Sequence, residues 1–368
     1  FLREEVKCRA LLTNLNGCFF PVAYQYCKEA DYDYVDDHFY VDHPSFLERK
    51  WQLPSRCPNV NPLANGRLGV QDMAHRRVLN RPFTCTEYNY SAPGRFRGVG
   101  GIATGALGAL QGWNGLWRFA WSHGRTGVVA PEKKALNYFD MSGDPLGLAS
   151  ERASICLFLR RDLPELTKTY AVHLPHGLVR RPNPDLGGWA SAPFTWAGWY
   201  AKLGTQLGET APAGTYPDVR KKTREAVFAD LGLVAPEDGD FPRAGEGAIR
   251  IDRDTGAFFI STPRTCGGFA EEGEIRSRAL VAELAGAPDG VGERARRPAA
   301  CDEFPHPRHA PDGRAEHRHH LRGRRPAHPP QMGEPPAPHA ERARGLPPAP
   351  CGRRVDGLCA AGGRNAQP

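Results

Sequence analysis

Segments typical of buried strands alternate with helical segments over residues 1–162, and this order limits the folds open to the chain. Short apolar runs that predict strands occupy residues 9–14, 34–40, 82–87 and 115–121. Between the third and fourth runs, residues 98–112 carry apolar side chains at helical spacing. Asp144 followed by Pro145, an N-cap and a first-turn proline, predicts a second helix. Strand, helix, strand, helix in this order implies a parallel α/β sheet or barrel.

From about residue 163 the sequence becomes typical of a β-rich domain. Residues 167–174 and 256–262 predict strands, and residues 223–233 predict a short helix. Gly- and Pro-rich segments separate them, as expected of loops. Two or three strands are too few to close a stable sandwich. We therefore expect a partial β-rich accessory domain at 163–290.

Residues 291–368 carry almost all of the net charge of the chain. Fourteen Arg and no Lys, against eight acidic residues, give this segment a net charge of +6 out of the total of +7. Its one aromatic residue is Phe304. Such a composition buries too little apolar surface to offset the entropy of ordering, so we expect a disordered tail.

The tail has the composition that GC-rich coding DNA gives in the wrong reading frame. Back-translation of residues 307–320 with a shift of one nucleotide permits an alternating, strand-like sequence. We interpret the tail as frame-shifted from near Gly290. A genuine Arg-rich arm that binds nucleic acid is the alternative. Because Lys is missing and aromatic residues to stack on bases are almost absent, we expect no nucleic-acid partner.

Membrane and metal-binding classes have little support in the sequence. No apolar run approaches the ~20 residues that cross a bilayer, so we expect no membrane partner. None of the ten Cys forms a C-x-x-C pair or has a His at zinc-finger spacing, and we expect neither metal nor cofactor. The chain does not begin with Met, and we interpret it as a fragment, which leaves its compartment and oligomeric state open.

Glu87 is the strongest candidate for a catalytic residue. It ends the strand predicted at 82–87, and the carboxyl ends of parallel strands build the active site in an α/β barrel. Tyr88 and Asn89 follow it and are candidate substrate-binding residues. A carboxylate among aromatic and amide groups suits attack on an oxocarbenium-like centre. The alternative is a strand-end Glu in a surface salt bridge.

Four further candidates for substrate binding end the neighbouring strands. His38 and Tyr40 end the preceding strand, where they can hydrogen-bond to a carboxylate or orient it. Trp121 and His123 end the following strand. An indole offers a flat apolar surface to a sugar ring and an N–H to a hydroxyl. The alternative is that His38 and Trp121 are core residues.

Three motifs in these segments resemble a known family. They are Asp-His-Phe-Tyr at 37–40, Pro-Phe-Thr-Cys-Thr-Glu-Tyr-Asn at 82–89 and Gly-Leu-Trp-Arg-Phe-Ala-Trp-Ser-His at 115–123. They are similar to the last barrel strands of the clan of retaining glycoside hydrolases that contains cellulases, mannanases and β-galactosidases. The resemblance implies that Glu87 is the nucleophile, that Tyr40 is the aromatic residue of the sixth strand, and that Trp121 stacks on sugar.

The resemblance also implies a fold, with boundaries. We expect the C-terminal half of a TIM (β/α)8 barrel at 1–162, then a partial β-sandwich-like domain at 163–290, then the disordered tail at 291–368. In this clan the acid/base is a Glu that follows Asn, and no Asn-Glu dipeptide occurs here. We therefore expect the first half of the barrel to be missing and the chain alone to be weakly active or inactive.

The function implied is hydrolysis of O-glycosidic bonds in a β-linked poly- or oligosaccharide. The mechanism would be a retaining double displacement on Glu87. One alternative is a non-catalytic carbohydrate-binding protein that uses its Trp and Tyr surfaces alone. Another is an inactive fragment.

Overall fold

The computed structural model describes a large part of the chain in twelve segments. They are residues 1–13, 31–63, 69–133, 135–179, 193–210, 214–217, 222–235, 240–244, 248–252, 256–270, 273–276 and 281–284. The chain divides into two units, Phe1–Pro305 and His306–Pro368, and every described residue lies in the first. The tail expected at 291–368 lies outside the described residues.

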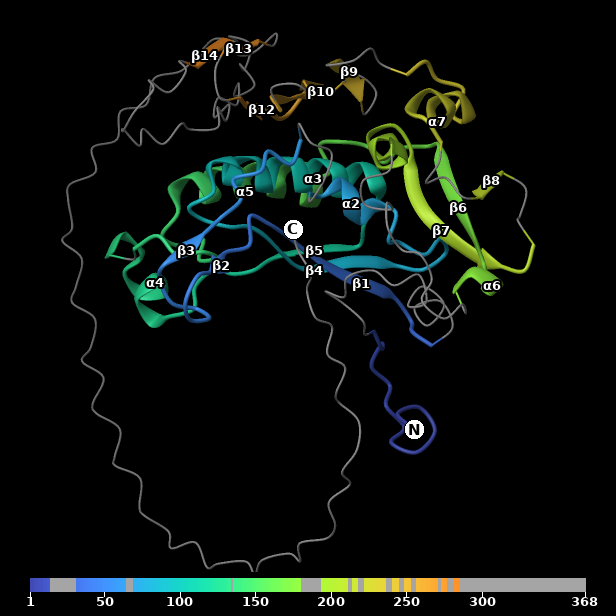
Figure 1. The fold of residues 1–368 in the computed structure, drawn as a ribbon, viewed down its shortest axis with the longest axis horizontal. Helices are drawn as coiled ribbons and strands as arrows, with labels where there is room; N and C mark the ends of the chain where they lie inside the picture. Colours follow the sequence, from blue (N-terminus) through green and yellow to red (C-terminus); the bar gives the residue numbers. More distant parts are fainter. Residues whose placement is uncertain are drawn as a thin grey trace, which may run out of the picture. The chain divides into compact units, whose positions relative to one another are not determined.

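The first sheet is parallel and three-stranded, with the strand order β1-β4-β5 (Figure 1). Its strands are β1 (Val35–Val41), β4 (Phe83–Tyr90) and β5 (Gly115–Arg118). The strands predicted at 34–40, 82–87 and 115–121 are thereby confirmed. β4 continues beyond its predicted end at residue 87. β5 stops before its own predicted end at residue 121.

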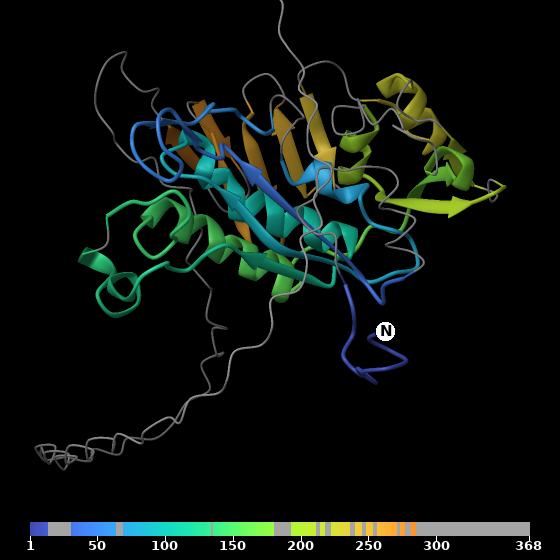
Figure 2. The ribbon, with the colours of Figure 1, turned by 60° about the horizontal axis from the view of Figure 1, so that its bottom comes forward.

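Two helices lie along one face of this sheet (Figures 1 and 2). They are α3 (Gly100–Gln111), which follows the 3-10 turn η1 (Arg95–Val99), and α5 (Pro145–Ser154). Both predicted helices are confirmed, and the side chain of Asp144 caps α5 by accepting the Leu146 N–H at 3.1 Å. All of α3 is buried, because the sheet covers one side of it and α5 covers another.

A second parallel sheet and a four-stranded antiparallel sheet follow. The parallel sheet has the order β7-β6-β8 and consists of β6 (Thr169–Pro175), β7 (Lys202–Gly208) and β8 (Thr215–Pro217). The antiparallel sheet has the order β12-β11-β10-β9 and consists of β9 (Asp240–Ala244), β10 (Ile249–Asp252), β11 (Phe258–Ser261) and β12 (Cys266–Phe269). β6 and β11 confirm the predicted strands, and α7 (Arg224–Asp230) confirms the predicted helix.

The remaining elements are short. They are β2 (Ser45–Phe46), β3 (Ser55–Arg56), α2 (Gln71–Ala74), α4 (Arg125–Val129), η2 (Pro131–Lys133), the π-helical turn η3 (Ile155–Leu159), α6 (His176–Val179), η4 (Pro193–Trp199), β13 (Gly273–Arg276) and β14 (Val281–Leu284). Among the described helices, none combines the length and the apolar character needed to span a membrane.

The expected fold class, half of a TIM barrel followed by a partial β-sandwich, is wrong. The described residues instead form a mixed α/β structure of several small sheets, of which the two parallel ones have three strands each. Strand-helix alternation is common to all parallel α/β arrangements, so it does not separate a barrel segment from a small open sheet. The region after residue 163 adds a parallel sheet, which a sandwich would not contain.

The strand predicted at 9–14 is also wrong over the residues that the structure describes. Residues 9–13, which the structure describes, lie beside the start of β1 but form no strand. The Leu12 carbonyl accepts the Asp33 N–H at 3.0 Å, yet the Leu12 N–H donates to the Asp33 side chain at 2.7 Å. A carboxylate thus takes the place of a neighbouring backbone carbonyl, and the ladder does not continue.

One hydrophobic core includes side chains from both predicted folded domains. Val35 and Leu107 belong to it, as do Tyr170, Trp199 and Phe258 from the later region. The predicted domain boundaries at 162 and 290 stay predictions.

Candidate active site on β1 and β4

A bulge in β4 brings two consecutive side chains to one histidine. β1 and β4 run parallel, with Asp36 opposite Thr84 but His38 opposite Glu87, so β4 holds one extra residue between these pairs. As a result His38 Nε2 lies 2.9 Å from Thr86 Oγ1, while His38 Nδ1 lies 3.6 Å from Glu87 Oε2. Regular alternation would have sent Thr86 and Glu87 to opposite faces.

Tyr40 holds the Glu87 carboxylate from the other side. It follows His38 by two residues, so both side chains leave β1 on one face. Its hydroxyl donates a hydrogen bond to Glu87 Oε1. Burial, together with this bond and the negative charge of Glu87, raises the pKa of Tyr40 well above its usual range. The phenol therefore stays protonated and remains a donor, while the Glu87 side chain keeps 31% of its surface exposed to a ligand.

Asp36, which the sequence analysis passed over, is the buried support of this group. Its carboxylate accepts the Thr84 hydroxyl at 2.8 Å, the Thr86 N–H at 3.0 Å and the Thr86 hydroxyl at 2.6 Å. It also lies 3.4 Å from His38 Nε2. The signal in the sequence is an Asp early in a predicted strand, opposite two threonines of the next strand.

Asn89 supports the backbone around the site. It is buried, and its amide donates to the carbonyl oxygens of Phe119 and of Phe139, the latter at 2.9 Å. Its oxygen accepts the Arg118 Nε–H at 2.9 Å. Asn89 therefore holds the segments at Phe119 and Phe139 against β4, and it does not reach the group around Glu87.

Tyr88 lies on the opposite face of the sheet from Glu87. It is fully buried, stacks on Phe39 at 5.5 Å between ring centroids, and donates to Glu151 Oε1 at 3.1 Å. Burial, and then the charge of Glu151, raise its pKa well above the usual value. The structure thus places Tyr88 in the core next to α5, away from the other candidates.

Trp121 and His123, which follow β5, are both exposed. Trp121 is 54% exposed, so it is not a core residue. His123 bonds through Nδ1 to the buried carboxylate of Asp140, which also accepts the His123 backbone N–H at 3.1 Å. The His123 ring lies 5.1 Å from that of Phe119, and Phe119 lies 6.4 Å from Tyr40. His123 is therefore joined to the central group through Phe119.

The structure thus brings together His38, Tyr40 and Glu87, with His123 one ring away. In the described part of the chain, no three His, Cys, Asp or Glu side chains are grouped so as to hold a metal ion.

The fold and the site define only a broad class, an α/β protein with a partly exposed carboxylate on one of two adjacent parallel strands, three residues before that strand ends. No family model matches the chain, and neither the curated proteins nor the solved structures contain a match to it. A functional assignment therefore depends on the geometry around Glu87 and on the resemblance seen in the sequence.

Proposed function

We propose that this protein is a retaining glycoside hydrolase that cleaves O-glycosidic bonds of a β-linked poly- or oligosaccharide, with Glu87 as its nucleophile. One observation supports this most strongly. Glu87 combines partial exposure with a hydrogen bond from the half-buried, protonated hydroxyl of Tyr40.

The two oxygens of Glu87 have different surroundings, which suits nucleophilic attack. Tyr40 binds Oε1, and Oε2 lies 3.6 Å from His38 Nδ1. In the first step Oε2 attacks the anomeric carbon and the glycosidic bond breaks, so that a glycosyl ester forms and the leaving oxygen takes a proton from an acid. In the second step water cleaves the ester and restores the carboxylate. Tyr40 restricts rotation of the carboxylate and so holds it ready for attack.

Dinitrophenyl β-glycosides of glucose, mannose and galactose test this role. Their leaving group departs without protonation, so the assay reports on the nucleophile and does not need the acid. We expect a burst of dinitrophenolate approaching one equivalent per chain, because the ester forms faster than it is hydrolysed. Glu87→Gln removes the nucleophile and should reduce the burst to background.

Glu132→Gln serves as the matched control, because Glu132 is an exposed residue of η2. It should leave the burst unchanged, and circular dichroism should show that both variants are folded. A full burst from Glu87→Gln would contradict the assignment.

A carbohydrate-binding protein without catalytic activity is the second candidate. Its support is the exposure of large aromatic residues, Trp51 and Trp121 among them, since such rings stack on sugars. It predicts sugar binding that survives Glu87→Gln, with no burst from any variant.

A further inference from the structure

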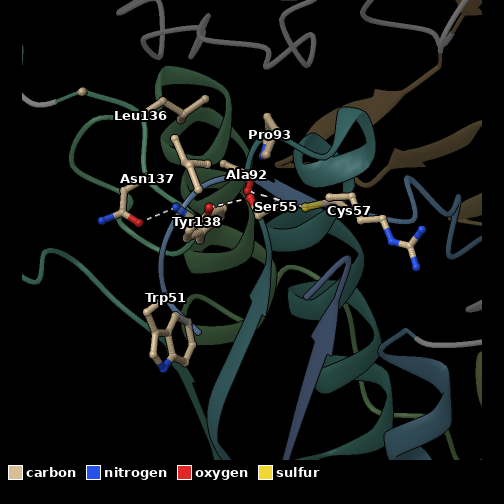
Figure 3. Close-up of a pocket in the computed structure, with 11 residues that line it drawn as sticks. Trp51, Ser55, Cys57, Ala92, Pro93, Leu136, Asn137 and Tyr138 are labelled. Carbon is tan, nitrogen blue, oxygen red and sulfur yellow. Dashed lines mark hydrogen bonds between the residues drawn. The ribbon is translucent and has the colours of Figure 1, made fainter. Parts of the chain in front are cut away.

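A cavity of about 520 Å³ lies outside the group of residues around Glu87 (Figure 3). Its wall comes from the segment around β3 and from residues 135–138, and it includes Trp51, Ser55, Asn137 and Tyr138. The volume is that of a small-molecule site, and a mainly apolar wall with a few polar groups is the usual composition of one.

Trp51 is presented to this cavity at a conformational cost. It is 54% exposed, although indoles are usually largely buried. Its φ of +64° is a left-handed conformation that a bulky side chain rarely adopts. Strained residues of this kind persist where their surroundings fix them, and they are concentrated at ligand-binding sites.

The Trp51 ring is held in place by other rings. Its centroid lies 4.9 Å from that of Phe46, 5.9 Å from His43 and 6.1 Å from Phe139. These contacts fix its position while about half of its surface stays free. Trp51 therefore offers a flat apolar surface that needs little further ordering when a ligand binds.

Polar groups lie close to this surface. The hydroxyls of Ser55 and Tyr138 are 2.6 Å apart, and the Asn137 side-chain oxygen accepts the Tyr138 N–H at 2.5 Å (Figure 3). Each hydroxyl oxygen retains a further lone pair, and the Asn137 amide retains its NH₂ for donation. An aromatic face beside hydroxyl and amide groups matches a sugar ring, which is apolar on its faces and polar around its edge.

Two aromatic side chains, Phe139 and Tyr40, connect Trp51 to Glu87. The Phe139 ring lies 5.3 Å from that of Tyr40 and 6.1 Å from that of Trp51. Tyr40 in turn bonds to Glu87. Packed rings therefore link Trp51 to the Glu87 site, with Phe139 buried between them.

We propose that this cavity binds a second sugar ring of the glycan whose bond Glu87 attacks, with Trp51 stacked on the ring. The proposal rests on the proposed function for the identity of the glycan. It explains why a strained and exposed Trp lies two side chains away from the candidate nucleophile. The site favours a chain of several sugar units over a monosaccharide.

Titration calorimetry of the full chain with cellotetraose, mannotetraose and galactotetraose, and with the matching monosaccharides, tests the proposal. We expect one tetraose to bind at least tenfold more tightly than its monosaccharide. Trp51→Ala should remove that difference, and Trp51→Phe should keep most of it. Trp51→Gly is the second variant, because Gly adopts a positive φ without strain and so preserves the turn even if the Ala variant does not fold.

Trp117→Ala is the matched control, since Trp117 is 53% exposed and is not among the residues of the cavity wall. It should bind the tetraose as the unmodified chain does. Equal tetraose affinity for Trp51→Gly and the unmodified chain would overturn the proposal, as would binding of no tetraose at all.

The dinitrophenolate burst distinguishes failure of the cavity proposal from failure of the proposed function. A burst that depends on Glu87, with binding that does not depend on Trp51, overturns the cavity proposal alone. Binding that depends on Trp51, without any burst, supports the cavity as a sugar site and overturns the catalytic role of Glu87.

Discussion

At the scale of single residues, the site depends on a hydroxyl that cannot readily lose its proton. Burial and the adjacent Glu87 charge hold the pKa of Tyr40 high, so the phenol donates to the carboxylate throughout the neutral range. Tyr40 and His38, the two neighbours of the Glu87 carboxylate, could be predicted from the sequence, because both lie near the end of the strand predicted at 34–40, beside that of Glu87. The alternation along β4 places Tyr88 on the opposite face from Glu87. The prediction of Tyr88 as a substrate-binding residue did not take this alternation into account.

Tyr40→Phe isolates the contribution of this hydroxyl. The ring and its packing against Phe139 remain, but the donor to Glu87 is lost. We expect the rate of the dinitrophenolate burst to fall by roughly 10²-fold, because the carboxylate is then free to rotate out of the position for attack. Stopped-flow absorbance measures it. Tyr88→Phe, the same change on the opposite face of the sheet, should leave the rate nearly unaltered, and an equal loss there would mean that packing is responsible.

At the scale of elements, local signals predicted most strands and helices but not how they meet. The Asp144-Pro145 cap and the spacing of Ile102 with Ala106 were sufficient to predict α5 and α3. The bulge in β4 was missed, although two consecutive polar residues, Thr86 and Glu87, break the alternation of the strand there. The early end of β5 was also missed, since its apolar sequence continues past Arg118 into Phe119.

Gly101 shows how closely α3 and α5 approach each other. A Cβ at this position would lie 2.5 Å from the backbone carbon and oxygen of Ser150, and a helix backbone cannot move aside cheaply. Gly101→Ala should therefore destabilise the protein by about 1–3 kcal/mol, although Gly→Ala normally stabilises a helix. Urea unfolding measures the change.

Gly177→Ala in α6 is the matched control, since open space surrounds that position. It should be neutral or slightly stabilising. A stabilising effect at Gly101 would show that the two helices are further apart than described.

At the scale of the whole molecule, the topology could not be predicted from local patterns in the sequence. Closure of a barrel and pairing of distant strands depend on contacts between segments far apart in the chain, which no local pattern reports. His75 illustrates such a contact: it follows α2, is buried, and packs on Phe194 of η4 at 5.2 Å. Sequence position alone gives no reason to place these two residues together.

His75 also makes the stability of the molecule depend on pH. Burial, and then the charge of Arg76, lower its pKa to about 3 from about 6.5 in the unfolded chain. The unfolded state therefore takes up the proton first. The contribution of neutral His75 is complete above pH 6.5 and is lost as the pH falls, by roughly 2 kcal/mol at pH 5.

Urea unfolding at pH 7 and pH 5 tests this prediction. The unmodified chain should lose about 2 kcal/mol more between the two pH values than His75→Gln, which stays neutral. Equal losses would mean that His75 is protonated as easily in the folded state as in the unfolded one.

The central claim is that Glu87 is the nucleophile, and covalent trapping tests it most directly. A fluorinated dinitrophenyl β-glycoside slows hydrolysis of the glycosyl ester, so that the labelled residue survives digestion and can be located by tandem mass spectrometry of the peptides. We expect one label per chain, on the side chain of Glu87, and none in the Glu87→Gln variant. A label on another residue, or the same labelling in Glu87→Gln, would contradict the account.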